Sequence, residues 1–203
     1  GAFTTIDSRL QFFYFNRINT YDEDGKLGIE LCGYDNNKII DDFYLATMTT
    51  TGIPEEHKSS LRRITLDLAQ SAATMENLNV NFELPNINLA YAGARHRYAY
   101  GVQSSNGCRM LSDSIAKYDF EKRQQTIWKE KHLIPGEPIF IATPNAKRED
   151  DGVLLVVCHD SKKHTACLVV LNAQDLRQIA VTYAPKHIPV SLHGFFYHGR
   201  RLA

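Results

Sequence analysis

Two carboxylates and one histidine stand in apolar surroundings that would take them out of water. Glu137 lies between two prolines and the apolar run 139–141, Glu83 lies between Phe82 and Leu84, and His193 lies between Leu192 and Gly194. A carboxylate that enters a dry environment must be paired, hydrogen-bonded or associated with a metal, because desolvating it alone is costly. Each of these side chains is therefore expected to have a definite partner.

A structural role is possible for each of them. Glu137 could cap backbone N–H groups at a strand end, with the acidic run 149–151 as a solvated hairpin tip, and spacing alone favours this interpretation. Glu83 could form a salt bridge with Arg95 or Arg97, and a lone buried histidine is usually bonded to the backbone. The sequence shows no Ser-His-Asp or Cys-His arrangement and no glycine-rich phosphate motif.

Composition bounds the class of protein and its partners. The chain has 203 residues, of which 43% are hydrophobic and 23% charged, which is ordinary for a globular protein and indicates one continuous architecture. Its 23 basic and 23 acidic residues cancel, so nothing favours nucleic acid as a partner. Small or apolar partners are expected.

Cysteine usage and the lack of targeting signals favour a reduced, cytoplasmic setting. The four cysteines (Cys32, Cys108, Cys158 and Cys167) show no C-x-x-C spacing. Cys158 and Cys167 could meet across a hairpin, but free buried thiols are preferred. No apolar run approaches the roughly 18 residues of a membrane span. The chain begins with Gly, so we expect a fragment or a processed piece.

Short apolar segments separated by polar turns predict an all-β fold. Strands are expected at 10–21, where dense aromatics suggest burial on both faces, and at 26–34, 61–68, 98–102, 115–120, 124–128, 153–160, 166–172 and 178–183. The run Asp22-Glu23-Asp24-Gly25 predicts a hairpin turn. Residues 69–79 are expected to be a loop, and 41–50 could be helix or strand. Pattern alone leaves sandwich, barrel and propeller open.

Four ordered motifs in the second half carry a resemblance to a known family. They are 136–140 (GEPIF), 149–154 (EDDGVL), 171–176 (LNAQDL) and 188–196 (IPVSLHGFF). Together they resemble the C-terminal part of the carotenoid cleavage oxygenases, and most of all the animal branch that contains the β-carotene oxygenases and the retinoid isomerase of the retinal pigment epithelium. The resemblance implies that residues 1–203 are the C-terminal portion of a seven-bladed β-propeller, about half of the family fold.

The resemblance also implies a metal site and roles for particular residues. The family holds Fe(II) with four histidines, three of them oriented by glutamates. His193 matches the last ligand, Glu137 the glutamate expected to hold its ring, and Glu83 the glutamate of a second motif. The third ligand position reads Asn16, in Phe15-Asn16-Arg17-Ile18-Asn19, and an amide oxygen is a poorer iron ligand than imidazole. The first two ligands are expected upstream of Gly1.

Two functions follow from the resemblance. The first is a non-haem Fe(II) dioxygenase that cleaves a conjugated double bond of a carotenoid or apocarotenoid with O₂, with peripheral membrane association and a mitochondrial location left open. Glu83, Glu137 and His193 favour it, because an abandoned site has no evident reason to keep buried carboxylates. The second is a non-catalytic fragment or pseudoenzyme that binds lipid or protein, which Asn16 favours. A cluster of His187, His193 and His198 is a less favoured metal site.

Overall fold

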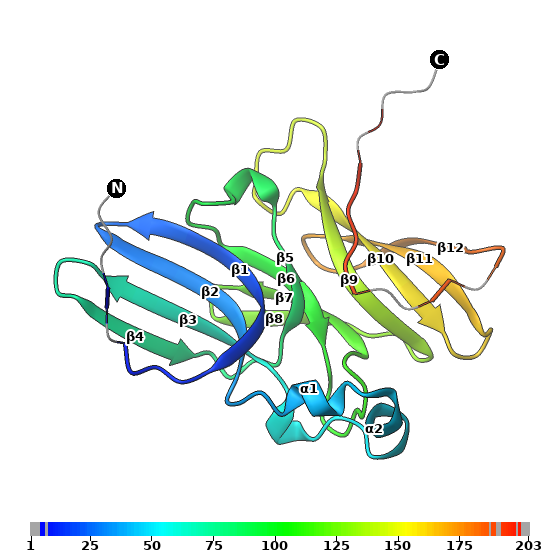
Figure 1. The fold of residues 1–203 in the computed structure, drawn as a ribbon. Coiled ribbons are helices and arrows are strands. Elements are labelled where there is room, and N and C mark those ends of the chain that lie inside the picture. Colours follow the sequence, from blue (N-terminus) through cyan, green and yellow to red (C-terminus); the bar gives the residue numbers. More distant parts are fainter. Residues whose placement is uncertain (1–4, 7, 187, 190–191, 198, 200–203) are drawn as a thin grey trace.

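Three four-stranded antiparallel sheets stand side by side in the computed structural model, which describes residues 5, 6, 8–186, 188, 189, 192–197 and 199 (Figure 1). The first sheet has the order β1 (Phe13–Glu23), β2 (Lys26–Tyr34), β3 (Ser60–Asp67) and β4 (Ala72–Asn77). The second has the order β5 (Glu83–Asn86), β6 (Tyr98–Gln103), β7 (Ser114–Asp119) and β8 (Gln124–Trp128). The third has the order β12 (Gln178–Tyr183), β11 (Thr165–Asn172), β10 (Gly152–Asp160) and β9 (Leu133–Ala142). The all-β prediction is confirmed.

Short helices occupy the connection between β2 and β3. They are α1 (Ile39–Asp42), α2 (Leu45–Thr50) and the 3₁₀ turn η1 (Glu55–His57), and a second 3₁₀ turn, η2 (Leu89–Tyr91), follows β5. Residues 41–50, which the sequence left unresolved, are thus mostly helical, and Figure 1 shows α1 and α2 at one end of the sheets. No helix in the described part of the chain is long and apolar enough to cross a membrane.

The hairpin turns form where the sequence predicts them. Asp24 and Gly25 take φ values of 53° and 76° between β1 and β2, the two left-handed positions that a tight hairpin turn requires.

Cys158 and Cys167 are directly opposite each other on β10 and β11, and both are free buried thiols. The preference for free thiols is confirmed.

Two local predictions are wrong. Within the expected loop 69–79, β4 pairs with β3 over six residue pairs, because backbone hydrogen bonding can complete an outer strand whose own side chains carry little apolar signal. The expectation that the aromatic strand is buried on both faces also fails, since Tyr14 is 49% and Phe15 43% exposed. Both residues belong to β1, which forms the edge of its sheet.

Two hydrophobic clusters hold the three sheets together. Between the first and second sheets lie Cys32, Leu61, Phe82, Ala99, Ala116 and Tyr118, with others. Between the second and third lie Tyr100, Val102, Ile115, Leu154, Val156 and Val169, with others. Each sheet therefore buries a face against its neighbour, the packing expected of successive blades of a propeller.

Three edge strands, one from each sheet, run next to one another. The strand β5 contacts both β1 and β9, and each of the three is the terminal strand of its own sheet. An edge strand has no partner on one side, so it tolerates Pro85 in β5 and Pro135 and Pro138 in β9. These strands carry Asn16, Glu83 and Glu137, so the fold brings the predicted site residues to one place.

The acidic run 149–151 ties the third sheet to the second. One oxygen of Glu149 accepts the backbone N–H groups of both Arg97 and Tyr98, at 2.9 and 2.7 Å. Asp150 is buried and its Oδ2 lies 2.7 Å from Lys117 Nζ. The interpretation of this run as a solvated hairpin tip is therefore wrong: two of its three carboxylates join separate sheets.

Candidate functional site

Each edge strand has an irregular register at its candidate residue. The pairing of β1 with β2 shifts on both sides of Arg17, next to Asn16. The pairing of β5 with β6 shifts between Glu83 and Asn86, and that of β9 with β10 shifts opposite the segment that holds Glu137. Bulges turn side chains away from the regular alternation and are common beside functional sites. The three strands thus share a local distortion where they meet.

Glu83 is buried, with 4% of its surface exposed, and it accepts three hydrogen bonds from protein groups. Oε1 accepts the Tyr34 hydroxyl at 2.7 Å, and Oε2 accepts Asn16 Nδ2 at 2.7 Å and the backbone N–H of Leu84 at 2.6 Å. Leu84 has a φ of 46°, an uncommon conformation for leucine, which accompanies the hydrogen bond of its own N–H to the preceding side chain. Both oxygens of the carboxylate are thus hydrogen-bonded to protein atoms.

Burial and hydrogen bonding act in opposite directions on Glu83. Burial raises the pKa of its carboxyl, and the bonds from Leu84, Tyr34 and Asn16, together with the charge of His193, partly offset that rise. Burial, followed by the adjacent Glu83 charge, raises the pKa of Tyr34, which stays a phenol that donates.

Glu137 holds both the ring and the backbone of the C-terminal segment. Its Oε1 lies 3.3 Å from His193 Nδ1, and its Oε2 accepts the backbone N–H of Gly194 at 2.8 Å. When Nδ1 donates, Nε2 is the unprotonated ring nitrogen, the form that can bind a metal. The backbone contact that spacing alone favours for Glu137 thus occurs together with the predicted contact to the ring.

The salt bridge considered for Glu83 does not form. Arg95 pairs with Glu23, and Arg97 pairs with Asp119 and Glu121, so both guanidinium groups are engaged by other carboxylates.

Two residues of the less favoured histidine cluster, His187 and His198, lie outside the described residues. Tyr34 was not predicted as part of the site, since it is 49 residues from Glu83 and no motif around it signals the contact.

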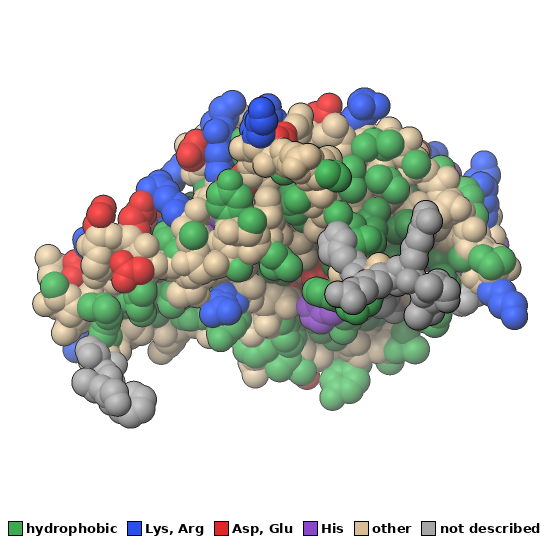
Figure 2. Space-filling view, turned by 90° about the horizontal axis from the view of Figure 1, so that it is seen from above, with side chains coloured by type: hydrophobic (Ala, Val, Ile, Leu, Met, Phe, Trp, Pro, Cys, Tyr) green, Lys and Arg blue, Asp and Glu red, His purple; other side chains and the backbone are tan. Residues whose placement is uncertain are grey.

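An apolar pocket lies beside Glu137. It has a volume of about 170 Å³ and is lined by Gly136, Glu137, Ile139, Leu155, Val157, Leu168, Gly194, Phe195 and Phe196. Figure 2 views the molecule from above and shows hydrophobic side chains over much of this face, with charged side chains mostly toward its outline. His193 is 61% exposed on its side chain, so its ring is open to solvent beside this apolar surface.

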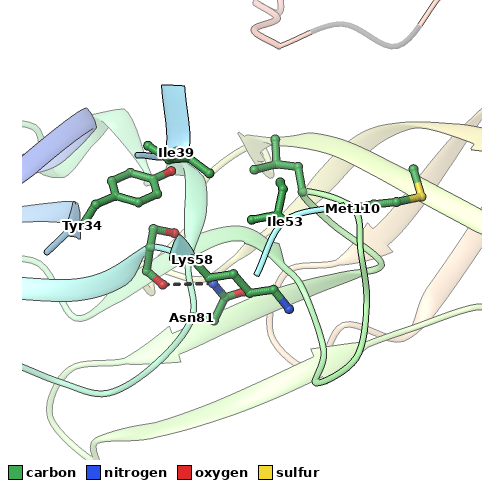
Figure 3. A pocket seen from close by; sticks show the side chains of 8 residues that line it. Tyr34, Ile39, Ile53, Lys58, Asn81 and Met110 are labelled. Atoms are coloured by element: carbon green, nitrogen blue, oxygen red, sulfur yellow. Dashed lines mark hydrogen bonds between the residues drawn. The ribbon is translucent and has the colours of Figure 1, made fainter. Parts of the chain in front are cut away.

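A second, much smaller pocket lies beside Tyr34. Figure 3 shows it lined by Tyr34, Ile39, Ile53, Lys58, Asn81 and Met110, together with Ser59 and Leu111. Asn81 Nδ2 donates to the Ser59 carbonyl at 2.9 Å across it. Its volume of about 10 Å³ is about that of one water site, so it is too small for an organic substrate.

The residues present fit part of a histidine-ligated iron site. His193 fits, because Glu137 fixes one ring nitrogen and leaves the other available. Asn16 does not fit as an imidazole ligand, because an amide offers a metal only its oxygen, and its nitrogen donates to Glu83. Within the described residues, no three His, Cys, Asp or Glu side chains are grouped so that they could hold a metal ion. Since protein donors bond both oxygens of Glu83, its presence does not by itself require a metal.

Comparison with known proteins decides the family. The model of the retinal pigment epithelial membrane protein family (RPE65) matches residues 4–198. The chain belongs to the RPE65/carotenoid oxygenase family. It is 33% identical to the carotenoid isomerooxygenase of Galleria mellonella and 30% identical to the β,β-carotene 15,15′-dioxygenase of Homo sapiens. These alignments cover 91% and 90% of the chain and 39% of each relative, so the chain spans about two fifths of their length.

Solved structures of carotenoid oxygenases have the same fold. The cobalt-substituted apocarotenoid oxygenase of Synechocystis superposes with a TM-score of 0.86 at 27% identity, over 96% of the chain and 41% of that protein. A chimera of that oxygenase with RPE65 gives 0.80 at 30% identity, over 89% of the chain and 38% of that protein. Carotenoid oxygenases are β-propellers, so the three sheets are blades of a propeller, and the chain covers about 40% of these proteins.

The close packing under Glu83 predicts a measurable effect for Gly101→Ala. A Cβ at Gly101 of β6 would lie 2.6 Å from Phe82 Cε1 and 2.7 Å from the Glu83 carbonyl oxygen, so β5 would have to move. The expected loss is about 1–3 kcal/mol in the free energy of unfolding, measured by denaturant titration. Gly194→Ala is the contrast, because its Cβ would meet only the Ile139 side chain, at 3.7 and 3.8 Å. If Gly101→Ala loses no more stability than Gly194→Ala, β5 accommodates the added methyl group.

Proposed function

We propose that this chain supplies the C-terminal portion of a non-haem Fe(II) dioxygenase that cleaves a conjugated double bond of a carotenoid or apocarotenoid. The carbonyl products take up the two oxygen atoms of O₂, one on each carbon of the broken bond. Support comes from the family, from relatives named carotenoid isomerooxygenase and β,β-carotene 15,15′-dioxygenase, and above all from the contact of His193 with Glu137. A lipid-phase substrate of this kind is consistent with peripheral membrane association.

The roles of the chain's own residues follow from their contacts. His193 would bind the metal through Nε2, with Glu137 holding Nδ1 and the Gly194 N–H and thereby restricting the ring. Bound Fe(II) would supply the reaction with O₂. The apolar pocket between Glu137 and Phe196 would receive a hydrocarbon and exclude water from the site.

A non-catalytic family member is the second candidate function. One observation favours it: Asn16 stands at a ligand position, and its hydrogen bond to Glu83 satisfies that carboxylate without imidazole or metal. In this case the apolar surface would bind a lipid or a protein without chemistry. The two candidates differ in whether the protein holds iron.

Iron content after anaerobic loading with Fe(II) is the first test. We expect bound iron in the purified protein and its loss in His193→Ala, because that substitution removes the imidazole that matches the family motif. His164→Asn is the matched control: it removes an exposed hairpin histidine whose φ of 53° suits asparagine.

Activity is then measured by incubating the loaded protein with a carotenoid and O₂ and identifying the carbonyl products. Two carbonyl products that depend on His193 would support the dioxygenase. Iron content indistinguishable among the unsubstituted protein and both variants would count against it and in favour of the non-catalytic candidate.

A further inference from the structure

The outer edge of the third sheet is open along β12 (Figure 1). Every residue of Gln178–Tyr183 is exposed, and within the described part of the chain β12 pairs only with β11. Ile179, Val181 and Tyr183 are apolar side chains with exposures of 50%, 42% and 39%. A long edge strand of this kind presents backbone groups on which another extended segment can pair.

The hydrogen bonds to β11 show which backbone groups of β12 face the open edge. The Ala184 N–H, just beyond the end of β12, donates to the Ala166 carbonyl oxygen of β11 at 2.9 Å. In an antiparallel pair, residues whose N–H and C=O face the partner strand alternate with residues whose groups face away. Thr182 therefore faces β11, and Val181 and Tyr183 turn their N–H and C=O groups toward the open edge.

The outer strands of the other two sheets carry or adjoin charged side chains. Glu76 of β4 pairs with Arg123 at 2.7 Å, and β8 lies between Arg123 and Lys129, with Ile127 as its one large exposed apolar side chain. Charge on an edge strand opposes pairing with another chain. The strand β12 has no charged residue at any position, so it is the least protected of the three outer strands.

The packing of the sheets would leave this edge open beside further blades. The sheets contact one another through their faces, as Ile115 of β7 and Val169 of β11 do within one apolar cluster. An additional blade of the same kind would cover a face of the third sheet and not its outer edge. The open edge of β12 is therefore not the place of a neighbouring blade.

Unpaired lysines lie in a groove along β12. Lys131 and Lys162 form no ion pair among the described residues. Asp160, also in the groove, already accepts the backbone N–H groups of Lys162 and Lys163 at 2.9 Å and the Tyr183 hydroxyl at 3.2 Å. The groove has a volume of about 280 Å³ and is lined by Glu130, Lys131, His132, Leu133, Asp160, Lys162, Gln178, Val181 and Tyr183. The two free ammonium groups favour acidic side chains in a ligand.

We propose that the outer edge of β12 binds an extended, acidic peptide segment of another protein, which adds to the third sheet as a further strand. The backbone groups of Val181 and Tyr183 supply the pairing, and Lys131 and Lys162 supply the preference for acidic side chains. The site is at the opposite edge of the sheet from β9, which carries Glu137. The inference therefore goes beyond the proposed function and does not depend on it.

The two other kinds of partner fit this edge less well. A second copy that paired through its own β12 would bring no acidic residue to the lysines, because β12 contains none. A membrane surface would meet the lysines but would leave the outward N–H and C=O groups of Val181 and Tyr183 without partners. An acidic peptide satisfies both the backbone groups and the charges.

Binding of a synthetic peptide to the purified chain tests the proposal. The probe is a short, fluorescently labelled peptide of alternating valine and glutamate residues, followed by fluorescence anisotropy. We expect saturable binding that weakens as salt is added, and slower hydrogen exchange at the amides of Val181 and Tyr183. Peptides with lysine in place of glutamate, or with proline in place of valine, should bind about tenfold more weakly or worse, because they reverse the charge or prevent strand pairing.

Two variants and a matched control locate the site. Val181→Pro removes an N–H that faces away from β11, so the pairing within the sheet is kept. Lys131→Met/Lys162→Met removes both cations of the groove, and Lys38→Met/Lys122→Met removes two exposed lysines that belong to the other sheets and their connections. We expect each of the first two to raise the Kd of the peptide about tenfold or more, and the control to leave it nearly unchanged.

The opposite results would overturn the proposal. No binding of the peptide, or equal affinity in Val181→Pro and the unsubstituted chain, would show that β12 does not accept a strand. Self-association of the chain that is lost in Val181→Pro would assign the edge to a second copy. Binding to vesicles that contain phosphatidylserine, lost in Lys131→Met/Lys162→Met and without peptide binding, would assign the lysines to a membrane. The double lysine variant changes no backbone group, so it remains decisive if Val181→Pro is unstable.

Discussion

Replacement of Lys117 by methionine is expected to lower the free energy of unfolding by about 3–5 kcal/mol, the range for breaking one partner out of a buried ion pair. Lys117 is 5% exposed, and its Nζ lies 2.7 Å from Asp150 Oδ2 and 2.9 Å from the Gln174 carbonyl oxygen. The ammonium also lies over the Tyr98 ring, 4.0 Å from its centre. Without it, the Asp150 carboxylate stays buried beside Arg148 alone.

Chemical denaturation of Lys117→Met, Lys122→Met and the double variant Lys117→Met/Asp150→Leu measures this effect. Lys122 is exposed, so its substitution should change stability little. The double variant should recover much of the loss, because it also removes the buried Asp150 carboxylate, which in Lys117→Met keeps only Arg148 as a charged partner. A loss below about 1 kcal/mol in Lys117→Met would show that the pair contributes no more than a surface salt bridge.

The importance of this pair could be read only from the structure. Asp150 belongs to a run of three acidic residues in a hairpin, and such runs are usually solvated. Lys117 lies 33 residues away on a strand, and the sequence pattern there predicts the strand but not the partner of the lysine. A sheet that packs against its neighbour brings residues together by topology, and no local sequence signal reports which strand will face which.

The strands themselves were predictable where side chains carry the signal. Alternation and turn residues located most of the strands, because half-buried strands alternate and tight turns need Gly, Asn or Asp. The strand β4 was not predicted because it lies at the outer edge of its sheet, where its side chains are mostly exposed and backbone pairing with β3 alone forms the strand. The sheet boundaries at β1, β5 and β9 were also hidden, although the prolines of β5 and β9 mark them in retrospect.

The candidate site was predictable to the extent that local motifs contain it. Glu137, Glu83 and His193 stand in motifs, and the structure places Glu137 against His193 and Glu83 against Asn16. For Glu83 the sequence offered a salt bridge to Arg95 or Arg97 and a metal-site role, but it did not indicate which groups bond the carboxylate. The structure shows that Tyr34 and the Leu84 N–H bond this carboxylate. The Tyr34 contact depends on pairing between distant strands and the Leu84 contact on a distorted backbone, and a local motif encodes neither.

Lowering the pH from 7.5 to 4 is expected to remove up to about 3 kcal/mol of stability through His96 alone. Burial, and then the nearby Arg63 charge, lower the pKa of His96 to about 4 from an ordinary value of about 6.5. The unfolded chain therefore takes up a proton first, so the contribution is complete above pH 6.5 and is lost as the pH falls to 4. The difference of about 2.5 pKa units corresponds to about 3 kcal/mol.

The groups around His96 set both its neutrality and a competing effect. Its Nε2 lies 3.1 Å from Glu30 Oε2, neither atom has a further hydrogen-bond partner among the described residues, and Asn19 Nδ2 lies 3.2 Å from its Nδ1. Burial also raises the pKa of Glu30, although Arg63 opposes the rise. The cost of that buried charge is relieved as the pH falls, so Glu30 acts in the opposite direction to His96.

Comparison of variants isolates the histidine from the glutamate. The free energy of unfolding of the unsubstituted chain, His96→Gln and His164→Asn is measured across this pH range, with Glu30 present in all three. The advantage of the unsubstituted chain over His96→Gln should shrink by about 3 kcal/mol between pH 7.5 and 4, because glutamine cannot take up the proton. The His164→Asn variant, which changes an exposed residue, should give a plot of unfolding free energy against pH that is parallel to that of the unsubstituted chain. Parallel curves for all three would mean that His96 is protonated equally in the folded and unfolded states, and that its burial between β2 and the start of β6 does not exclude the charge.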